Sequence, residues 1–193
     1  MQRKSNRMEA GERQIRAVYT KDTVRVYQAY GRNIAEEAVK KGTFGENFKM
    51  GRMTWIKPSF LWMMYRCGWA TKESQEYVLA IELEREAFDY IVENAVPSSY
   101  SEMLGISRSQ WEERVKNSAL RCQWDPERDI FGNPLNYRSI QLGLRGDAVR
   151  KYVDGWIRGI SDITGYVKEL DGKRKKGIDI SGLLPQEKIY LTP

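Results

Sequence analysis

Basic and amide side chains that could hold an anionic ligand occur together early in this sequence, between residues 13 and 30. Arg16 and Arg25 lie within otherwise apolar runs, and Gln28 is flanked by tyrosines. An arginine inside an apolar strand faces either solvent or a cleft. In a cleft, its planar guanidinium could hold a phosphate or pyrophosphate through two hydrogen bonds. This run therefore predicts either a solvent-facing strand or part of an anion site.

A second candidate region is the Trp- and Met-rich run GRMTWIKPSFLWMMYRCGW. Trp55, Lys57 and Ser59 lie where a strand is expected to end and a helix to begin, and such junctions are natural anion sites. Arg52 and Arg66 add positive charge on either side of the junction. The apolar residues of the helix are expected in the core. We therefore expect one wall of a ligand site at this junction.

Three carboxylates mark the start of the third region. Asp125, Glu127 and Asp129 alternate with other residues around Arg128. Oxygen ligands of this kind could hold a metal ion. The arginine among them favours a local network of ion pairs instead, and we expect no metal site here.

The third region ends in a run with one polar face, YRSIQLGL. Strand alternation places Tyr137, Ser139 and Gln141 on one face, and Arg138 on the other. A strand with a wholly polar face either lies at an exposed edge or lines a pocket.

The chain has no histidine, and this excludes several kinds of catalytic site. Ser-His-Asp and Cys-His nucleophilic systems need an imidazole, and so do His-containing zinc sites. The two cysteines, Cys67 and Cys122, cannot form a Cys-only zinc site. Acid–base chemistry would therefore fall to Glu, Asp, Lys, Tyr or water.

The charge balance suggests the kind of partner. The 193 residues carry a net charge of +6, which favours nucleic acid or a nucleotide as partner, although mildly basic proteins also occur without such partners. No apolar run approaches the roughly 18–20 residues that cross a membrane, and the polar start is unlike a secretory signal. We expect a cytoplasmic protein with two free thiols and no membrane partner.

The order of the expected elements indicates an α+β fold with a mixed, mainly antiparallel (split) sheet and flanking helices. Residues 1–12 are expected to form a polar arm, residues 13–170 a single globular domain, and residues 171–193 a basic, partly mobile tail. The Asp125-Pro126 pair is expected to end one strand, and Ser107 and Ser109 are candidate caps of a helix. Strands are expected at 13–19, 23–30, 52–57, 76–83, 119–124 and 137–144, and helices at 33–41, 58–66, 84–94, around Trp111, at 146–160 and at 161–170.

Several of these runs together resemble one known family. RQIRAVY, VRVYQAY, RMTWIKPSFLWMMYRCGW, QWDPERD and NYRSIQLGL are similar to the bacterial and fungal domain-of-unknown-function family 4291, over roughly residues 13–170. The long Trp-Lys-Pro-Ser block makes this resemblance specific. The family carries no assigned activity, so the resemblance implies kinship and no chemistry.

A more remote resemblance links VYQAYGRNIAEEAVKKGTF to the opening of ADP-ribosyltransferase-like folds. In those folds an aromatic–His pair on a strand leads into a short helix, and here Gln28 stands where that His would be. Their catalytic Glu is expected on a late strand, where SIQLGL offers Gln141. The resemblance implies NAD as cofactor, with Gln28 and Gln141 at the reacting ribose.

The same resemblance and the residue types together suggest a wider site. Arg16 could clamp the pyrophosphate of NAD, and an aromatic ring could stack on the nicotinamide. The residues expected at the cofactor are Arg16, Tyr19, Tyr27, Tyr30, Thr54, Trp55, Lys57 and Ser59. Those expected at nucleic acid are Arg52, Arg66, Arg128 and Arg138.

We therefore expect an ADP-ribosyltransferase-like, NAD-binding protein that acts on nucleic acid or a nucleotide. One alternative is a non-catalytic nucleic-acid-binding module, because basic charge interleaved with aromatics suits backbone contacts and base stacking. Another is a metal-dependent nuclease or phosphotransferase that works without histidine and uses the carboxylates of residues 125–129.

Overall fold

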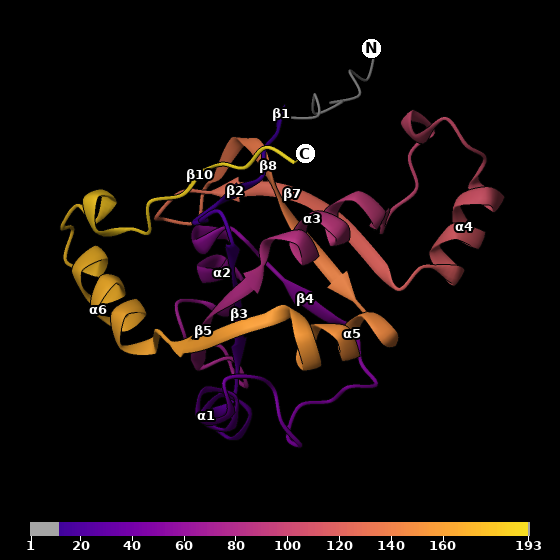
Figure 1. The fold of residues 1–193 in the computed structure, drawn as a ribbon. Helices are drawn as coiled ribbons and strands as arrows, with labels where there is room; N and C mark the ends of the chain where they lie inside the picture. The colour runs from indigo at the N-terminus through magenta and orange to yellow at the C-terminus, as the bar shows by residue number, and fades with distance from the viewer. Residues whose placement is uncertain (1–11, 193) are drawn as a thin grey trace, which may run out of the picture.

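The protein folds into two main β-sheets and a small two-stranded sheet, flanked by helices, and this confirms the expected α+β class with mixed sheets (Figure 1). The computed structural model describes residues 12–192. The helices are α1 (Arg32–Lys41), α2 (Phe60–Cys67), α3 (Arg85–Asn94), α4 (Arg108–Asn117), α5 (Asp147–Lys151) and α6 (Thr164–Lys175), with short turns η1 (Glu102–Leu104), η2 (Tyr152–Trp156, π-helical) and η3 (Ser181–Leu183).

The first sheet is built around a long antiparallel pair, β7 (Leu120–Arg128) and β8 (Pro134–Leu144). On one side β6 (Val96–Pro97) runs parallel to β7. On the other side two short strands share the edge of β8, with β1 (Glu12–Arg13) parallel to it and β4 (Thr54–Ile56) antiparallel. Glu12 thus belongs to this sheet, and the rest of the expected polar arm, residues 1–11, lies outside the described residues.

The second sheet is entirely antiparallel, in the order β3 (Thr23–Tyr30), β5 (Tyr77–Glu84), β9 (Ile157–Asp162). Both of its faces are covered, because alternate residues of β5 enter two different apolar clusters. Leu79 and Ile81 join the main core, whereas Val78 and Ala80 pack with residues of α2 and α6. This explains the almost continuous apolar run YVLAIEL, which is typical of a strand buried on both faces.

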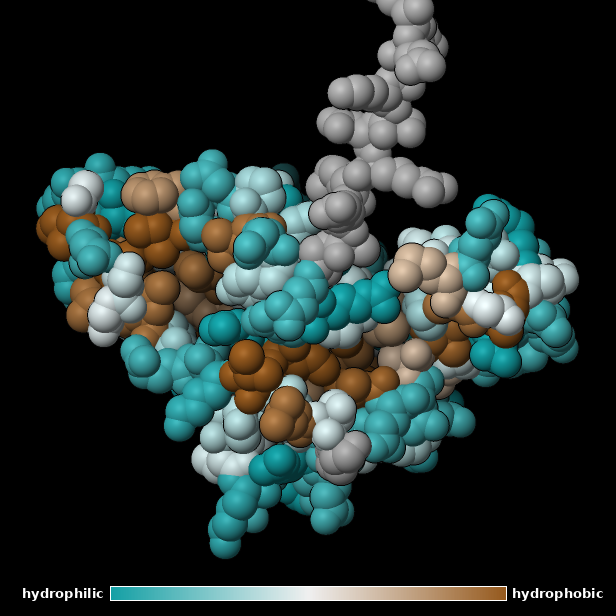
Figure 2. Space-filling model, turned by 90° about the horizontal axis from the view of Figure 1, so that it is seen from above, coloured by the Kyte–Doolittle hydropathy of each residue, from teal (hydrophilic) through white to brown (hydrophobic). Residues whose placement is uncertain are grey.

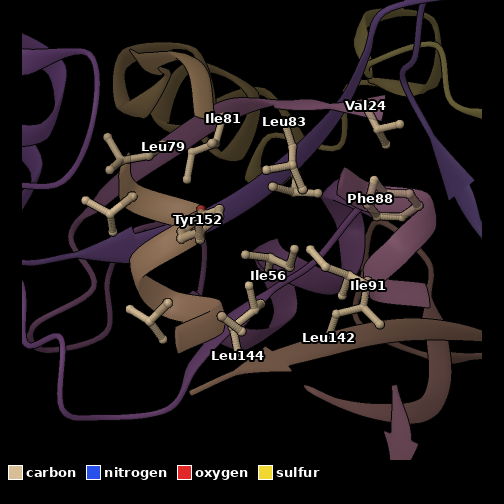
Figure 3. Packing of buried hydrophobic residues seen from close by; sticks show 14 of the residues in the cluster. Val24, Ile56, Leu79, Ile81, Leu83, Phe88, Ile91, Leu142, Leu144 and Tyr152 are labelled. Atoms are coloured by element: carbon tan, nitrogen blue, oxygen red, sulfur yellow. The ribbon is translucent and has the colours of Figure 1, made fainter. Parts of the chain in front are cut away.

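The main core lies between the two sheets (Figure 3). Leu79, Ile81 and Leu83 of β5 project from one sheet, and Leu142 and Leu144 of β8 project from the other. All five are fully or almost fully buried, and burial of each such side chain stabilises the fold by roughly 1.5–3 kcal/mol.

A short backbone bridge joins the two sheets at the end of β4. The amide N–H of Tyr27 in β3 donates to the carbonyl of Lys57 at 2.7 Å, and the amide N–H of Lys57 donates back to the carbonyl of Tyr27 at 3.3 Å. The residue that follows β4 is therefore held between both sheets, and its main chain is fixed by the fold.

Helix termini follow the local sequence as expected. Gly42 ends α1 in the left-handed region, with φ 72°, after Lys40 and Lys41, and cations suit the negative end of a helix. Ser107 caps α4 in a capping box with Gln110.

Three expected elements differ from the structure. The run 13–19 is not one strand, because it contributes two short strands, residues 12–13 and 16–17, to different sheets. The run 146–160 is not one helix, because its last residues leave α5 and η2 to pair with β5 as β9. Asp125-Pro126 does not end β7, which continues to Arg128. A register shift between Pro126 and Arg128 accommodates the proline, as bulges commonly do.

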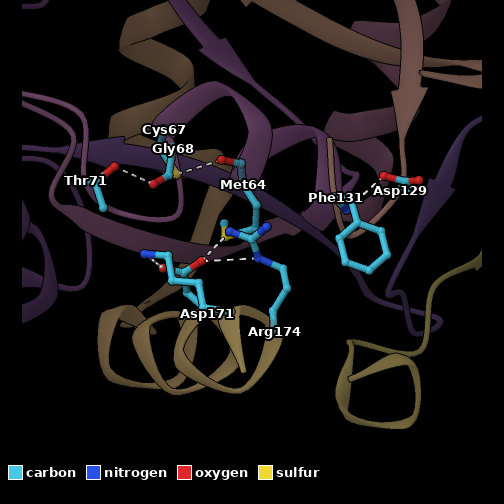
Figure 4. A network of polar contacts seen from close by, with 9 residues as sticks. Met64, Cys67, Gly68, Thr71, Asp129, Phe131, Asp171 and Arg174 are labelled. Carbon is cyan, nitrogen blue, oxygen red and sulfur yellow. Dashed lines mark hydrogen bonds and ion pairs between the residues drawn. The ribbon is translucent and has the colours of Figure 1, made fainter. Parts of the chain in front are cut away.

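The C-terminal segment, expected from residue 171 on to be a basic, partly mobile tail, is packed against the domain. Helix α6 continues to Lys175, and Asp171 is paired with Arg174 (Figure 4). The guanidinium of Arg174 lies 4.8 Å from the centroid of the Trp69 ring. Further on, β10 (Lys188–Ile189) pairs with β2 (Arg16–Ala17). The basic composition expected for residues 171–193 gave no sign of the apolar and aromatic side chains in this segment, because their packing partners lie far away in the sequence.

Seen from above, hydrophobic residues gather on the left of the molecule, where Figure 1 places α6 and the segment after it (Figure 2).

Within residues 12–192, no helix combines the length and the apolar composition that a membrane crossing requires.

Tyr190 is the principal apolar anchor of the C-terminal segment. Its ring is 4% exposed and packs edge-on against Tyr19 and Phe88, and its hydroxyl donates to Asp89. Because truncation leaves a cavity and an unpaired carboxylate, we expect Tyr190→Ala to lower the free energy of unfolding by about 3–5 kcal/mol in urea titrations. Leu191→Ala, at a side chain that is 77% exposed, is the matched control. Equal losses in both variants would contradict this packing.

Glu187 makes a second anchor, which depends on pH. One carboxylate oxygen accepts from the amide N–H of Phe60 at 2.6 Å, at the first turn of α2. Burial raises the pKa of Glu187 to about 8 against the opposing hydrogen bond from Phe60, and nearby Glu127 raises it further while Arg16 lowers it. A carboxyl group with a raised pKa stabilises the fold while protonated. This contribution is complete below the unfolded pKa near 4.5 and is lost as the pH rises through about 8.

We therefore expect the stability of Glu187→Gln to exceed that of the wild type increasingly between pH 5 and pH 8.5, by about 1–3 kcal/mol at the upper end. The neutral amide still offers an oxygen to Phe60 but cannot ionise. Urea unfolding at several pH values measures the difference. Glu102→Gln, at an exposed glutamate on η1, should leave the pH profile unchanged, and parallel profiles for Glu187→Gln and wild type would refute the assignment.

Candidate functional site

A cavity of about 540 Å³, here called the main cleft, opens where β3, β4 and α2 meet. It collects many of the residues that the sequence singled out from separate runs. It is lined by Gln28, Ala29, Tyr30, Ile34, Phe48, Lys49, Arg52, Met53, Thr54, Trp55, Lys57, Met63, Arg66, Ser74 and Gln75.

A second cavity of about 280 Å³, the side cleft, lies next to the first. Trp55, Lys57 and Arg66 line both cavities and so form the boundary between them. The rest of the side cleft is lined by Trp62, Gln123, Asp125 and Gln141. The expected site wall at the strand–helix junction is therefore present, and it faces two cavities.

Local structure fixes Lys57 at this boundary. Its backbone is bridged to Tyr27, and Pro58 follows it. Ser59 then begins α2 as N-cap, because its hydroxyl accepts from the amide N–H of Trp62 at 3.1 Å. The backbone of Lys57 has little freedom, because a strand end, a proline and a capped helix follow one another here. The first atoms of the Lys57 side chain are therefore held at the boundary.

A glycine on the neighbouring strand leaves the space that the Trp55 ring occupies. Trp55 pairs with Gly143 of β8. A Cβ added at Gly143 would lie 3.1 Å from the Trp55 ring and 3.0 Å from the sulfur of Met53. The missing side chain thus lets the indole lie against the sheet, where it forms a half-exposed aromatic wall shared by both clefts.

The main cleft is strongly cationic. Lys49, Arg52, Lys57 and Arg66 line it, and no carboxylate does. None of the four forms an ion pair with a residue between 12 and 192, although eight other pairs occur there. Four uncompensated cations around one cavity repel one another, and an anion bound among them would remove that cost.

Lys57 is the buried member of this group, at 8% exposure. Desolvation lowers its pKa to about 8, the charge of Arg66 lowers it further, and Cys67 and Asp125 raise it. No hydrogen bond from its amine to any described residue is present, although its amine lies between two cavities. Perturbed and unpartnered groups of this kind cluster at functional sites.

Gln28 lines the floor of the main cleft, but its amide is fully engaged within the protein. The side chain is 3% exposed. Its oxygen accepts from the hydroxyl of Tyr152 at 2.8 Å. Its nitrogen lies 2.6 Å from Thr54 Oγ1, 2.9 Å from the Tyr30 hydroxyl and 3.2 Å from the Trp55 carbonyl. Gln28 therefore holds the floor of the cleft in place, and in this structure it has no free hydrogen-bonding group for a ligand.

Gln141 lies in the side cleft and is also occupied. Its amide donates to Asp125 at 2.8 Å, and Gln123 donates to the other oxygen of the same carboxylate at 2.9 Å. The two glutamines that the resemblance placed at one reacting ribose thus line different cavities. Asp125, held by both amides of the side cleft, is the acidic group that faces this site.

Four of the expected cofactor residues line neither cleft. Arg16 bonds Gln14, and its guanidinium lies 5.3 Å from the centroid of the Tyr137 ring. Tyr19 packs against Tyr190. Strand alternation turns Tyr27 away from Gln28 into the apolar cluster with Phe60, and Ser59 is used as the helix cap.

The four expected nucleic-acid contacts divide evenly. Arg52 and Arg66 line the main cleft. Arg128 lies outside it, with its guanidinium 4.1 Å from the centroid of the Tyr65 ring, and Arg138 donates to the carbonyl of Trp124.

Some site residues carried no recognisable signal in the sequence. Lys49 and Met53 belong to an irregular segment before β4. Ser74, with φ 61°, reaches the cleft from a turn after α2 in which Trp69 and Ala70 also have positive φ. Left-handed backbone at non-glycine residues costs roughly 1–2 kcal/mol each and concentrates at functional sites. No periodic pattern marks such loops, and only tertiary contacts bring them to the cleft.

The carboxylates of residues 125–129 serve three separate roles. Asp125 faces the side cleft, Glu127 is buried and accepts from the amide of Arg128, and Asp129 caps its own turn through Phe131 and Asn133. In the part of the chain that the structure describes, no group of three or more His, Cys, Asp or Glu side chains is spaced to hold a metal ion.

The role of Gln28 as a support for the cleft floor predicts a stability effect. We expect Gln28→Ala to lower the free energy of unfolding by about 2–3 kcal/mol, because the buried hydroxyls of Tyr152 and Thr54 lose their partner. Urea titration measures this. Gln75→Ala, at a less buried glutamine of the same cleft, should change stability by less than about 0.5 kcal/mol. A comparable small change in Gln28→Ala would mean that its network contributes nothing.

Comparison with known proteins gives a family and no activity. A search of curated proteins finds no match. The family model described as Domain of unknown function (DUF4291) matches residues 14–190, a span that contains every residue of both clefts. The match covers nearly the whole chain and agrees with the resemblance of the Trp-Lys-Pro-Ser block. The chain therefore belongs to the DUF4291 family.

Proposed function

We propose that this protein binds a nucleotide in the main cleft and acts on that nucleotide or on nucleic acid, with NAD as the first ligand to test. In this proposal Arg52, Lys57 and Arg66 contact phosphate oxygens, and the Trp55 ring lies against a base or nicotinamide.

The observation that carries the proposal is the set of four cations without ion-pair partners around a cavity that no carboxylate lines. Arginine and lysine hold phosphates through charge-assisted hydrogen bonds, each worth roughly 1.5–3 kcal/mol. The volume of about 540 Å³ is in the usual range for small-molecule sites. The half-exposed Trp55 adds the flat apolar surface that a nucleotide ring requires.

ADP-ribosyl transfer is the reaction we propose for NAD as ligand. Transfer passes through an oxocarbenium-like state, which a nearby carboxylate stabilises. For Asp125 to support this step, the reacting ribose of a nucleotide held in the main cleft extends past Lys57 and Arg66 into the side cleft, which Asp125 lines. No histidine or metal is needed for a reaction of this type.

Calorimetric titration with NAD, ATP and inorganic phosphate tests the proposal. We expect the nucleotides to bind and to raise the melting temperature, and we expect binding to weaken as salt is added. Arg52→Gln and Arg66→Gln should each weaken nucleotide binding by roughly tenfold or more, and the double variant should weaken it further. Labelled NAD reports transfer and hydrolysis in the same samples.

Arg150→Gln is the matched control, because Arg150 is exposed, pairs with Asp147 and lines neither cleft. It should leave nucleotide affinity unchanged. If no nucleotide binds at low ionic strength, or if all three arginine variants lose affinity equally, the main cleft is not the site.

Nucleic-acid binding is a second candidate, favoured by an aromatic surface beside the clefts. Tyr65 is 44% exposed, and its ring stacks on the buried Trp62 with ring centroids 5.5 Å apart and an interplanar angle of 19°. The guanidinium of Arg128 lies over Tyr65. Such surfaces suit single-stranded nucleic acid. A single-stranded oligonucleotide that binds more tightly than mononucleotides, with loss of affinity in Tyr65→Ala, would favour this candidate.

A further inference from the structure

We infer that Lys57 is a nucleophile, and that its amine forms an imine with the aldehyde carbon of a phosphate-bearing reducing sugar held in the main cleft. This inference rests on the proposed nucleotide site and specifies the chemical class of its substrate.

The position of the amine is the first argument. Lys57 is 8% exposed, yet its side chain reaches both cavities. Among residues 12 to 192, none accepts a hydrogen bond from the Lys57 amine and none forms an ion pair with it, although a buried ammonium normally requires such partners. Two backbone hydrogen bonds to Tyr27 fix its main chain. An amine on a largely buried residue with a fixed main chain, without a partner in the described chain and beside open volume, is available to react with a bound ligand.

The surroundings favour the neutral, nucleophilic form of the amine. Desolvation and the neighbouring cation Arg66 both lower the pKa of Lys57, while Cys67 and Asp125 act in the opposite direction, and the result is about 8. At neutral pH roughly a tenth of the molecules then carry a neutral amine, compared with well under a hundredth for an ordinary lysine. Burial and a neighbouring cation are the two usual means by which proteins activate a lysine for attack on carbonyl carbon.

The reaction requires no oxidant or reductant. The Lys57 nitrogen attacks the aldehyde carbon, and the carbonyl electron pair moves to oxygen, which takes up a proton. The nitrogen releases one of its two protons to solvent, and the hydroxyl of the resulting carbinolamine takes up a second proton and leaves as water while the nitrogen lone pair forms the C=N bond. A proton leaves the nitrogen to solvent, and the reverse steps restore the free lysine.

The charges of the cleft point to a phosphate on the same molecule. Lys49, Arg52 and Arg66 surround Lys57 without ion-pair partners in the described chain, so they would hold a phosphate while the aldehyde meets the amine. A ribosyl nucleotide that has lost its base carries both groups, because the freed sugar carbon is an aldehyde in the open-chain form. The substrate class thus follows from nucleotide binding and a reactive amine at one site.

Reductive trapping tests this inference. The full chain is incubated with ribose 5-phosphate and cyanoborohydride, and intact mass and peptide mapping locate the reduced adduct. We expect one adduct at Lys57 that forms at least about tenfold faster than adducts at the other lysines. Ribose without phosphate should react far more slowly, because it lacks the group that the cations hold.

Two variants serve as matched controls. Lys57→Arg keeps the positive charge but cannot form an imine, because a guanidinium stays protonated, and it should lose the fast adduct. Lys72→Arg makes the same change at an exposed lysine that lines neither cleft and should keep it. If Lys57→Arg does not fold, the peptide map of the wild-type protein still decides the question.

The outcomes separate this inference from the proposed function. Calorimetry without reductant measures whether ribose 5-phosphate binds. Binding with adducts spread evenly over the exposed lysines, or with no adduct, overturns the imine and leaves the phosphate site intact. Failure of both ribose 5-phosphate and nucleotides to bind overturns the proposed function and this inference together.

Discussion

Two backbone hydrogen bonds between Lys57 and Tyr27 are the constraint on which the site depends. Strand β4 pairs with β8 of the first sheet, and the next residue pairs with β3 of the second. A single short segment therefore belongs to both sheets. Because side chains alternate along it, Ile56 enters the core while Trp55 and Lys57 face the clefts. The bridge therefore determines the positions of the residues on either side of it.

The burial of the second sheet on both faces decides what Gln28 does. An amide in such surroundings must satisfy its hydrogen bonds internally. Tyr152 supplies a donor, and Thr54 and Tyr30 take part from the cleft floor. The network joins η2, β3 and β4, so it stabilises the position of the floor. A residue expected to contact ligand instead supports the residues that can.

The electrostatics of the molecule are uneven. Some cations elsewhere, including Arg25 and Arg174, are paired with carboxylates, whereas the four that line the main cleft have no such partner in the described chain and face no carboxylate in that cleft. Lys57 differs from its neighbours because it is buried, which makes its charge the most costly of the four. An anionic ligand bound beside Lys57 relieves the cost of its buried charge, and so does loss of the proton to give a neutral amine. The proposed nucleotide site depends on the first effect and the proposed imine on the second.

The sequence by itself determined the elements and the most informative junction. Apolar periodicity and helix caps located β3, β5, α1 and α3 nearly to the residue, because these signals act between neighbours in the chain. Tertiary structure alone decided that Arg16 lies away from the clefts, that residues 157–162 form a strand, and that Tyr190 anchors the C-terminal segment. Each depends on partners distant in sequence. Alternation along a strand shows which side chains share a face but does not show which face meets a cavity. Only the packing of the two sheets determines which face lines the clefts.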